Sequence, residues 1–410
     1  MPQDHFFWPK PREQQPGWTR VVLAILLLGM AVAACNPTPN QEQQLTARLD
    51  TVLAASWQFY KVHFIQADGR VVRPENHHDT ISEGQAYALL RAVWSNDQAT
   101  FDRVYGWTEA HLSQQPRNGR HLLAWHFGQD QQGQWRLLDG NSATDADLDY
   151  ALALLLAQRR WGRPSGPLPA YQEKAILVLR DILSHNTCRD PWDRLWLTPG
   201  DWASCQLPLL LNSSYFSPAA YEVFYWTSGD RRWLQLADSA YQGLELLSRR
   251  FGEQTGVGLV PDWCLLRAKE DFAPAPEQSA AFGWDAIRVP WRVGLAAVWF
   301  QDKRARHFLA KTFLPFARQQ WQAHGRLSAV FTYDGRALED YDSPVLYASL
   351  VAAALADGDQ TLARQAVEKI LGFYQEGPEG GFFNRPDDYY GNNWAWFGLA
   401  AYRGLVVPQW

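Results

Sequence analysis

From residue 45 to the C-terminal end, apolar side chains recur at the spacing of amphipathic helices, and this periodicity constrains the fold more than any other feature. No run of β-branched residues has the composition of a sheet strand. The pattern predicts twelve helices, near residues 45–63, 82–95, 98–112, 145–161, 168–185, 217–227, 230–249, 284–300, 302–322, 343–357, 358–374 and 392–405. Pro315 interrupts the ninth, which should be kinked or shorter. Helices in six hairpins predict an all-α fold, an (α/α)6 barrel, with two stacked bundles or an open α-solenoid as alternatives.

The even-numbered helices begin with N-terminal signals. These signals are Ser82 with Gln85, Thr144 with Asp147, Ser217 before Pro218, and Ser343 before Pro344. In a barrel the even helices form the inner ring and run the same way, so their N-termini meet at one mouth. Long loops lead into this mouth at residues 113–144, 186–216, 250–283 and 375–391. Long loops in a compact domain are usually functional, so we expect the site here.

The N-terminal segment has the features of an export signal. Residues 21–34 form an apolar run that follows three basic residues and is too short to span a bilayer, as in a secretory signal. The run ends in Val32-Ala33-Ala34-Cys35, which resembles a bacterial lipobox with Cys35 as the lipidated residue; an ordinary signal peptide is the alternative. We expect a leader over 1–34, a polar tether over 35–45 and a single helical domain over 46–410. Asn36 favours the outer membrane as the destination.

Export makes a disulfide possible. Apart from Cys35 the chain has Cys188, Cys205 and Cys264. Cys188 and Cys205 lie in one long loop and are the expected pair. No histidine lies near either in the sequence, which argues against a zinc site.

Three acidic residues fall at the starts of predicted inner helices: Glu83, Asp145 and Asp285. Any one of them has a structural explanation, because acids in a first helical turn interact favourably with the helix dipole. Three acids at one mouth suggest glycoside hydrolysis by inversion, which needs a carboxylic acid and a carboxylate on opposite sides of a sugar.

The segments around these acids resemble glycoside hydrolase family 8. Ala143-Thr144-Asp145-Ala146-Asp147 and the helix after it are similar to the family signature, with a departure at Tyr150. The segments 80–87 and 284–292 resemble the family's general-acid segment and the general-base segment of its cellulase-like branch. Further family stretches are Asn212 to Pro218 and Pro261-Asp262-Trp263, so the likeness covers about residues 50 to 405.

The resemblance implies an (α/α)6 barrel and an inverting mechanism without metal or other cofactor. It makes Glu83 the proton donor, Asp285 the base that activates water, and Asp145 a holder of hydroxyls on the distorted sugar. One conflict remains, because a helix N-terminus lowers the pKa of Glu83, whereas a general acid must keep its proton near neutral pH. Burial or a nearby carboxylate must outweigh the dipole. Arg288 would keep the base ionised, although a plain helix ion pair explains it equally well.

Other polar residues near the acids have competing interpretations. Asp147 is best explained by capping, and Asp149 either shares a face with Asp145 or lies on the helix surface. Tyr215 is either a packed loop aromatic or a hydroxyl that orients the base or the water. His77-His78-Asp79 is a poor metal motif, because adjacent residues rarely converge on one ion.

The chain has 21 Trp, and many are expected at the mouth. These are Trp125, Trp135, Trp192, Trp196, Trp202, Trp263, Trp284, Trp394 and Trp396. Indoles stack on the apolar faces of pyranose rings, although some must only pack loops onto the barrel. Trp125 and Trp263 are the best candidate sugar contacts, and Tyr389-Tyr390 with Asn392-Asn393 form a further edge of the groove.

These observations predict an exported, lipid-anchored, monomeric inverting hydrolase that cleaves internal β-1,4-glucosidic bonds of a β-glucan polysaccharide. The same fold acting on xylan, chitosan or mixed-linkage glucan is the enzyme alternative, and a non-catalytic polysaccharide-binding surface lipoprotein is the other. Binding modules need no acid and base, which favours an enzyme. A net charge of -5 argues against a nucleic-acid partner.

Overall fold

The computed structural model describes residues 39–409. The predicted leader and the predicted lipidation site at Cys35 lie outside the described residues. The chain divides into two units, residues 1–48 and 49–410, and the second carries the helices and loops discussed below. Among the described residues, no helix has the length and apolar character needed to cross a membrane.

All twelve predicted helical segments are helical. The inner helices are α3 (Ser82–Trp94), α6 (Thr144–Trp161), α8 (Pro218–Ser228), α10 (Val289–Phe300), α13 (Pro344–Asp357) and α15 (Tyr389–Tyr402). The outer helices are α2 (Pro39–His63), α4 (Gln98–His111), α7 (Tyr171–His185), α9 (Arg232–Arg249), α11 (Lys303–Lys311), α12 (Phe313–His324) and α14 (Gln360–Gly372). A short helix, α5 (Gln115–Asn118), and the 3-10 turns η1 (Pro74–Asn76), η2 (Ser213–Tyr215) and η3 (Ala286–Arg288) lie in the loops.

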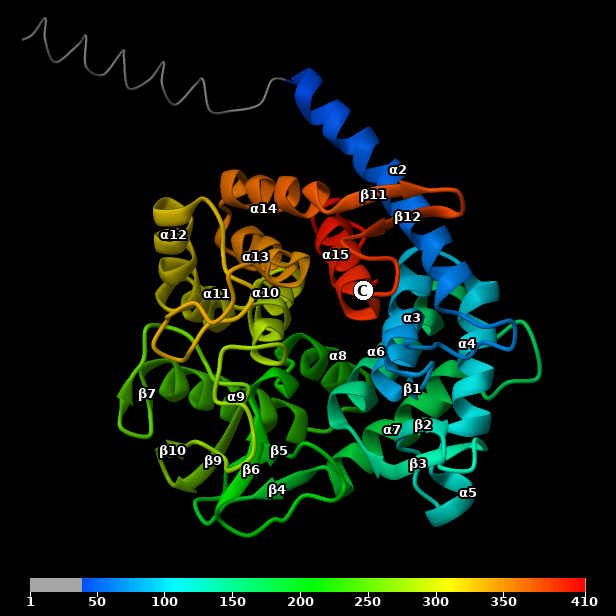
Figure 1. Ribbon diagram of the computed structural model, residues 1–410. Helices are drawn as coiled ribbons and strands as arrows, with labels where there is room; N and C mark the ends of the chain where they lie inside the picture. The colour runs from blue at the N-terminus through cyan, green and yellow to red at the C-terminus, as the bar shows by residue number, and fades with distance from the viewer. Residues whose placement is uncertain (1–38, 410) are drawn as a thin grey trace, which may run out of the picture. The chain divides into compact units, whose positions relative to one another are not determined.

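The inner helices form a closed ring. Successive inner helices pack against each other from α3 to α15 in chain order, and Figure 1 shows them around a common centre with α4, α7, α9 and α14 outside. Arg91 of α3 closes the ring, since its guanidinium donates to the Asn392 carbonyl and the Asn393 side chain of α15, both at 3.4 Å. The predicted (α/α)6 barrel is therefore confirmed, and an open solenoid is excluded for residues 49–409.

Several predicted boundaries are wrong. The ninth helix is two helices, and its break falls at Thr312 rather than at Pro315, which the first turn of α12 accommodates. Helix α2 begins at Pro39, so part of the predicted tether is helical. The segment predicted to start the eighth helix at 284 instead forms η3 before α10.

Three of the four predicted caps make no capping bond, and for two of them the N-cap position itself is wrong. Ile81 and Ala143 occupy the N-cap positions of α3 and α6, and neither makes a side-chain cap. Gln85 accepts from the Val71 N–H at 2.6 Å and donates to Thr108 at 2.8 Å, so it joins a loop and an outer helix to α3 instead. Gln85 is buried in the barrel wall, where its amide group contacts other segments rather than the backbone of its own helix.

The other two caps precede prolines. Ser343 caps α13 as predicted, because its hydroxyl accepts from the Val345 N–H at 3.3 Å. Ser217 holds the N-cap position before Pro218 but caps nothing. Its hydroxyl accepts from Arg292 at 3.4 Å.

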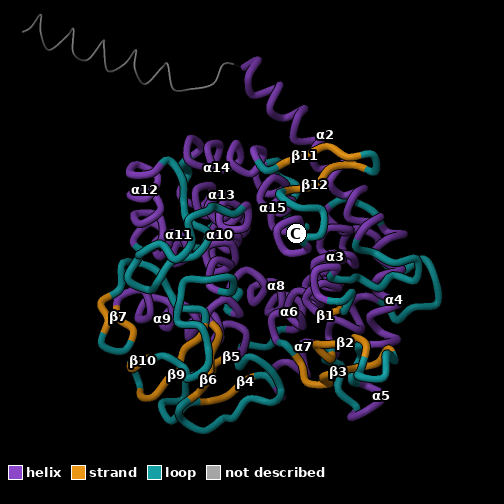
Figure 2. Tube along the Cα trace, in the orientation of Figure 1, coloured by secondary structure: helices purple, strands orange, loops and turns teal. Residues whose placement is uncertain are grey.

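The long loops contain short antiparallel strands (Figure 2). The sequence did not predict them, because no segment has the composition of a strand. One sheet joins β1 (Thr80–Ile81), β2 (Ala124–Gln129) and β3 (Trp135–Ser142), and another joins β6 (Leu209–Asn212), β9 (Trp263–Ala268) and β10 (Asp271–Ala273). The two-stranded pairs are β4 (Thr187–Arg189) with β5 (Leu195–Leu197), β7 (Arg250–Phe251) with β8 (Gln254–Thr255), and β11 (Tyr374–Gly377) with β12 (Gly380–Phe383). Backbone groups in these loops need partners, and ladders this short leave no alternating pattern in the sequence.

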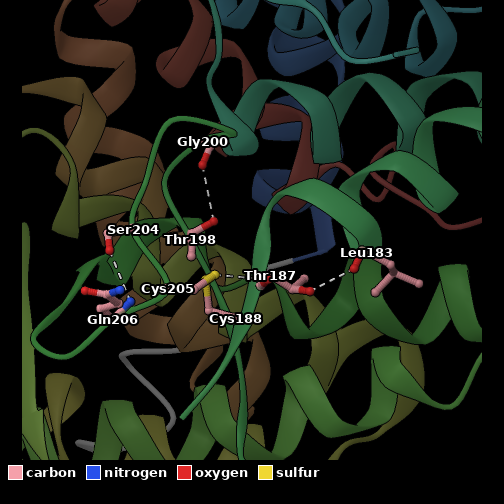
Figure 3. The surroundings of a disulfide bond; sticks show 8 residues. All are labelled: Leu183, Thr187, Cys188, Thr198, Gly200, Ser204, Cys205 and Gln206. Carbon is pink, nitrogen blue, oxygen red and sulfur yellow. Dashed lines mark hydrogen bonds between the residues drawn. A yellow bond between two sulfur atoms is a disulfide. The ribbon is translucent and has the colours of Figure 1, made fainter. Parts of the chain in front are cut away.

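A disulfide joins Cys188 to Cys205, as predicted (Figure 3). It closes a loop that supports the N-terminus of α6. Within the loop the Pro199 carbonyl accepts from the Thr144 N–H at 3.0 Å, and the Asp201 carboxylate accepts from the Ser142 N–H at 2.8 Å. Cys264 is buried and unpaired.

Candidate active site

One guanidinium, that of Arg288, joins the three predicted acids. Glu83 is in the first turn of α3, Asp145 is in the first turn of α6, and Asp285 directly precedes η3. Nη1 of Arg288 donates to Glu83 at 2.7 Å and to Asp145 at 2.8 Å, while Nη2 donates to Asp285. The Ser214 hydroxyl accepts from Nη2 at 2.8 Å. Arg288 is only 2% exposed, so its charge is balanced inside the protein.

Glu83 has the electrostatic character of a general acid. Burial, together with the charges of Asp145 and Asp285, raises the pKa of Glu83 to about 7 against the opposing effect of Arg288. Tyr87 and Tyr389 donate to its two oxygens at 3.2 and 3.3 Å. Desolvation therefore outweighs the helix dipole, which resolves the conflict seen in the sequence.

Asp285 accepts hydrogen bonds from three side chains. Arg288 bonds its Oδ1, while Trp263 Nε1 and Asn212 Nδ2 donate to its Oδ2 at 2.9 and 3.1 Å. Asn212 and Trp263 face each other across the β6–β9 ladder, so the strand register delivers both donors to one oxygen. These three donors fix the orientation of the Asp285 carboxyl group.

Tyr215 lies beside the acids. The Arg288 guanidinium is 5.7 Å from the centre of its ring, and the Trp263 ring is 6.1 Å away. Burial, with the charges of Asp145 and Asp285, raises the pKa of Tyr215 well above its ordinary value, so its hydroxyl stays protonated. Whether this hydroxyl orients the base or the water remains a prediction.

A cavity of about 530 Å³ opens onto two of the three acids, and Asp145 does not line it. It is lined by Glu83 and Asp285, with Trp284 and Tyr390 forming part of its aromatic wall. Trp284 is 44% exposed, and Tyr390 donates to its carbonyl at 2.8 Å. The cavity therefore combines two carboxyl groups with aromatic surfaces, a composition that suits a sugar ligand.

The model of the glycosyl hydrolases family 8 matches residues 30–399 of the chain. The chain belongs to this family.

Curated relatives and solved structures agree with this assignment. Endoglucanase A of Acetivibrio thermocellus is 32% identical over 82% of this chain and 67% of that protein. The endoglucanase of Escherichia coli K12 is 29% identical over 58% of this chain and 62% of its own length. The chain spans between about half and two thirds of the first curated relatives that it matches.

Solved structures share the fold. A β-1,3-1,4-glucanase from Paenibacillus sp. X4 superposes with a TM-score of 0.72 at 24% identity, covering 88% of this chain and 93% of that one. A cold-adapted family 8 xylanase gives a TM-score of 0.68 at 18% identity, over 87% and 91% of the two chains.

The predicted aromatic platform of this family 8 chain is smaller than expected. Trp196, Trp394 and Trp396 are fully buried and belong to the core. Trp135, Trp192 and Trp202 are exposed. Trp125 is half-buried on β2, stacks on His126 at 4.6 Å and does not line the cavity. Position in a mouth loop does not distinguish a side chain that points into the groove from one that points under the loop.

The two other acids of the family 8 signature segment are structural. Asp147 caps nothing, because its oxygens accept from the Leu123 N–H at 2.9 Å and from Asn186 at 3.4 Å. Asp149 is not on the surface, because both its oxygens bond Arg292, at 2.8 and 2.9 Å.

The His77-His78-Asp79 segment uses its acid elsewhere, since Asp79 accepts from Arg73, Asn76 and His126. Within residues 39–409, no group of three His, Cys, Asp or Glu side chains is placed to hold a metal.

Sequence reasoning missed two residues that contact the acids, Tyr87 and Asn212, and also Ser214, whose hydroxyl accepts from Arg288. Tyr389, predicted at an edge of the groove, donates to Glu83. Tyr87 was detectable, because it lies one helical turn after Glu83. Asn212 and Ser214 belong to a family-like stretch, but their contacts depend on strand pairing that the sequence does not show.

Proposed function

We propose that this chain is an inverting endoglucanase that hydrolyses internal β-1,4-glucosidic bonds of cellulose-like glucans. The arrangement around Arg288 carries the proposal, because it joins a carboxyl group with a pKa of about 7 to a carboxylate held by three donors. Several family 8 relatives are named endoglucanases, which supports this choice of substrate.

The reaction needs one proton from Glu83 and one water molecule. Glu83 gives its proton to the glycosidic oxygen as the bond from C1 to that oxygen breaks. Asp285 takes a proton from water, whose oxygen bonds C1 from the opposite face, so the new hydroxyl has inverted configuration. Asp145 accepts from hydroxyls of the sugar at the cleavage point. Glu83 then regains a proton and Asp285 loses one to solvent.

Replacing Glu83 tests the assignment of the acid. The Glu83→Gln variant should lose chain cutting of soluble cellulose, measured as viscosity loss, while it still binds cello-oligosaccharides. An unchanged rate of viscosity loss would reject Glu83 as the proton donor.

Proton NMR of the first product tests inversion. The α-anomer should appear before mutarotation mixes the two forms, whereas a β-anomer first would reject the mechanism. Reducing-end release from carboxymethyl cellulose, xylan, chitosan and mixed-linkage glucan identifies the polymer. A higher rate on any of the last three than on carboxymethyl cellulose would overturn the substrate assignment.

We also propose that the chain is exported as a monomer and anchored by lipid at Cys35 to the cell envelope, with the outer membrane as its destination. The lipobox-like sequence supports the anchor, and the closed ring of one chain, which supplies every described site residue, supports the monomer. Incorporation of a labelled palmitate analogue should occur in the full chain and be lost in Cys35→Ser. Equal labelling of both would reject this anchor. Light scattering should give the mass of one chain, and a dimer mass would reject the monomer.

A further inference from the structure

A fourth carboxylate, Asp262, contacts the backbone of the segment that carries Asp285. Asp262 is 3% exposed and directly precedes β9. Its Oδ1 accepts from the N–H groups of Gly283 at 3.1 Å, Asp285 at 3.1 Å and Ala286 at 2.6 Å. Its Oδ2 accepts from the Ser279 hydroxyl at 2.6 Å. A single buried carboxylate thus accepts from three backbone N–H groups of the segment 283–286 and from one hydroxyl.

Two of these donors, the N–H groups of Asp285 and Ala286, stand at the start of η3, where a helical N-terminus leaves N–H groups without partners. An aspartate at an N-cap normally accepts with its own side chain from the N–H groups two or three residues further along the chain. Asp285 holds the N-cap position of η3 but makes no such bond. Asp262, from another segment, accepts from the backbone on both sides of this position, and the carboxylate of Asp285 faces Arg288, Trp263 and Asn212.

The close approach depends on a glycine. A Cβ atom on Gly283 would lie 2.4 Å from Oδ2 of Asp262, which is far inside van der Waals contact. Trp263, the residue that follows Asp262 in the chain, donates to the Asp285 carboxylate. Asp262 and Trp263 therefore hold the backbone and the side chain of the same aspartate.

We infer that Asp262 is a positioning residue for the reaction, because it holds the backbone of the turn that carries Asp285 and so aims the general base at its water. This inference rests on the proposed function. A shift of a reacting group by about 1 Å can cost on the order of 100-fold in rate, so a relaxed turn should slow the chemical step more than it weakens sugar binding.

Two substitutions at Asp262 test the inference on the full chain. Asp262→Ala removes every acceptor and should lower kcat about 100-fold, while the Kd for cellotetraose, measured by calorimetry, changes less than about threefold. Asp262→Asn keeps an acceptor oxygen toward the three N–H groups and should recover kcat to within about tenfold of the original chain. Unchanged kcat in Asp262→Ala would overturn the inference. Equal loss of kcat in the two variants would also overturn it.

Gly283→Ala perturbs the contact between Asp262 and the turn by adding a methyl group on the turn. It tests the inference if Asp262→Ala does not fold. It should also lower kcat with little change in the Kd for cellotetraose, and full activity would count against the inference. Asp271→Ala is the matched control, because Asp271 forms an exposed ion pair with Arg267 in the same hairpin and should keep full activity. Asp285→Asn separates the proposed mechanism from the proposed role of Asp262. An active Asp285→Asn variant would reject the mechanism. An inactive Asp285→Asn variant together with a fully active Asp262→Ala variant would reject only the role of Asp262.

Discussion

Arg288 balances the charge of the site. Its guanidinium bonds three carboxylates while almost fully buried, and a buried charge without such partners would be unfavourable. It also opposes the effect of burial on Glu83 and so holds the pKa of Glu83 near 7 rather than higher. A general acid with this pKa is protonated below neutral pH, which is the form that the reaction requires.

The first prediction concerns pH. The kcat/KM of the original chain should fall as the pH rises through about 7, because Glu83 loses its proton. In Arg288→Gln the opposing charge is gone, so the pKa of Glu83 rises and the alkaline limb should move to higher pH. The rate itself should drop by about 100-fold or more. Initial rates between pH 5 and 9 measure both effects, and a limb that moves to lower pH would contradict the assignment.

At the scale of elements, a second ion pair repeats the contact between α6 and α10 one turn deeper in the barrel. Asp149 and Arg292 lie four residues after Asp145 and Arg288, and both members of the pair are buried. The pair therefore fixes the register of the two helices that present the acids and the guanidinium.

The second prediction follows from this burial. Asp149→Asn should lower the free energy of unfolding by about 3–5 kcal/mol, because it leaves the charge of Arg292 uncompensated. Urea denaturation measures the change. The double variant Asp149→Leu with Arg292→Met should recover most of the loss, and a double variant less stable than the single one would contradict the argument.

The third prediction concerns the loop closed by the disulfide. Cys188 and Cys205 are separated by 17 residues, and opening a loop of this length should lower the free energy of unfolding by about 3 kcal/mol. Thermal denaturation should therefore shift to lower temperature with reductant. The variant with both residues changed to Ser should melt at the lower temperature with or without reductant. The buried thiol of Cys264 provides a control, since Cys264→Ala should keep the response to reductant.

For the whole molecule, closure of the ring depends on contacts between the first and last inner helices. Arg91 of α3 donates to α15 and also to Ser56 of α2, and its guanidinium lies 4.2 Å from the centre of the Tyr60 ring. One buried side chain therefore joins segments from both ends of the described chain.

The fourth prediction is that Arg91→Ala lowers the free energy of unfolding by about 3 kcal/mol or more, through a cavity and unpaired acceptors. Urea denaturation again measures the change. Arg249→Ala on the exposed face of α9 is the matched control and should stay within about 0.5 kcal/mol of the original chain. Similar losses in the two variants would show that Arg91 has no special role in closure.

The helices and their pairing were predictable from sequence, because helical periodicity is a local property that each segment carries alone. Family-like motifs likewise identified Glu83, Asp145 and Asp285 as candidates. Their contact was not predictable, since Arg288 reaches residues more than a hundred positions away only when the ring closes.

Tertiary structure decided what each polar side chain does. Gln85 and Asp147 have the sequence pattern of caps, yet burial against other segments gave them different partners. The conflict over Glu83 was visible in the sequence, but only its desolvation in the assembled site resolved it. The sequence by itself determined where helices form and which acids stand at their starts. Burial, charge compensation and strand register, which depend on distant segments, determined which of those acids share a site.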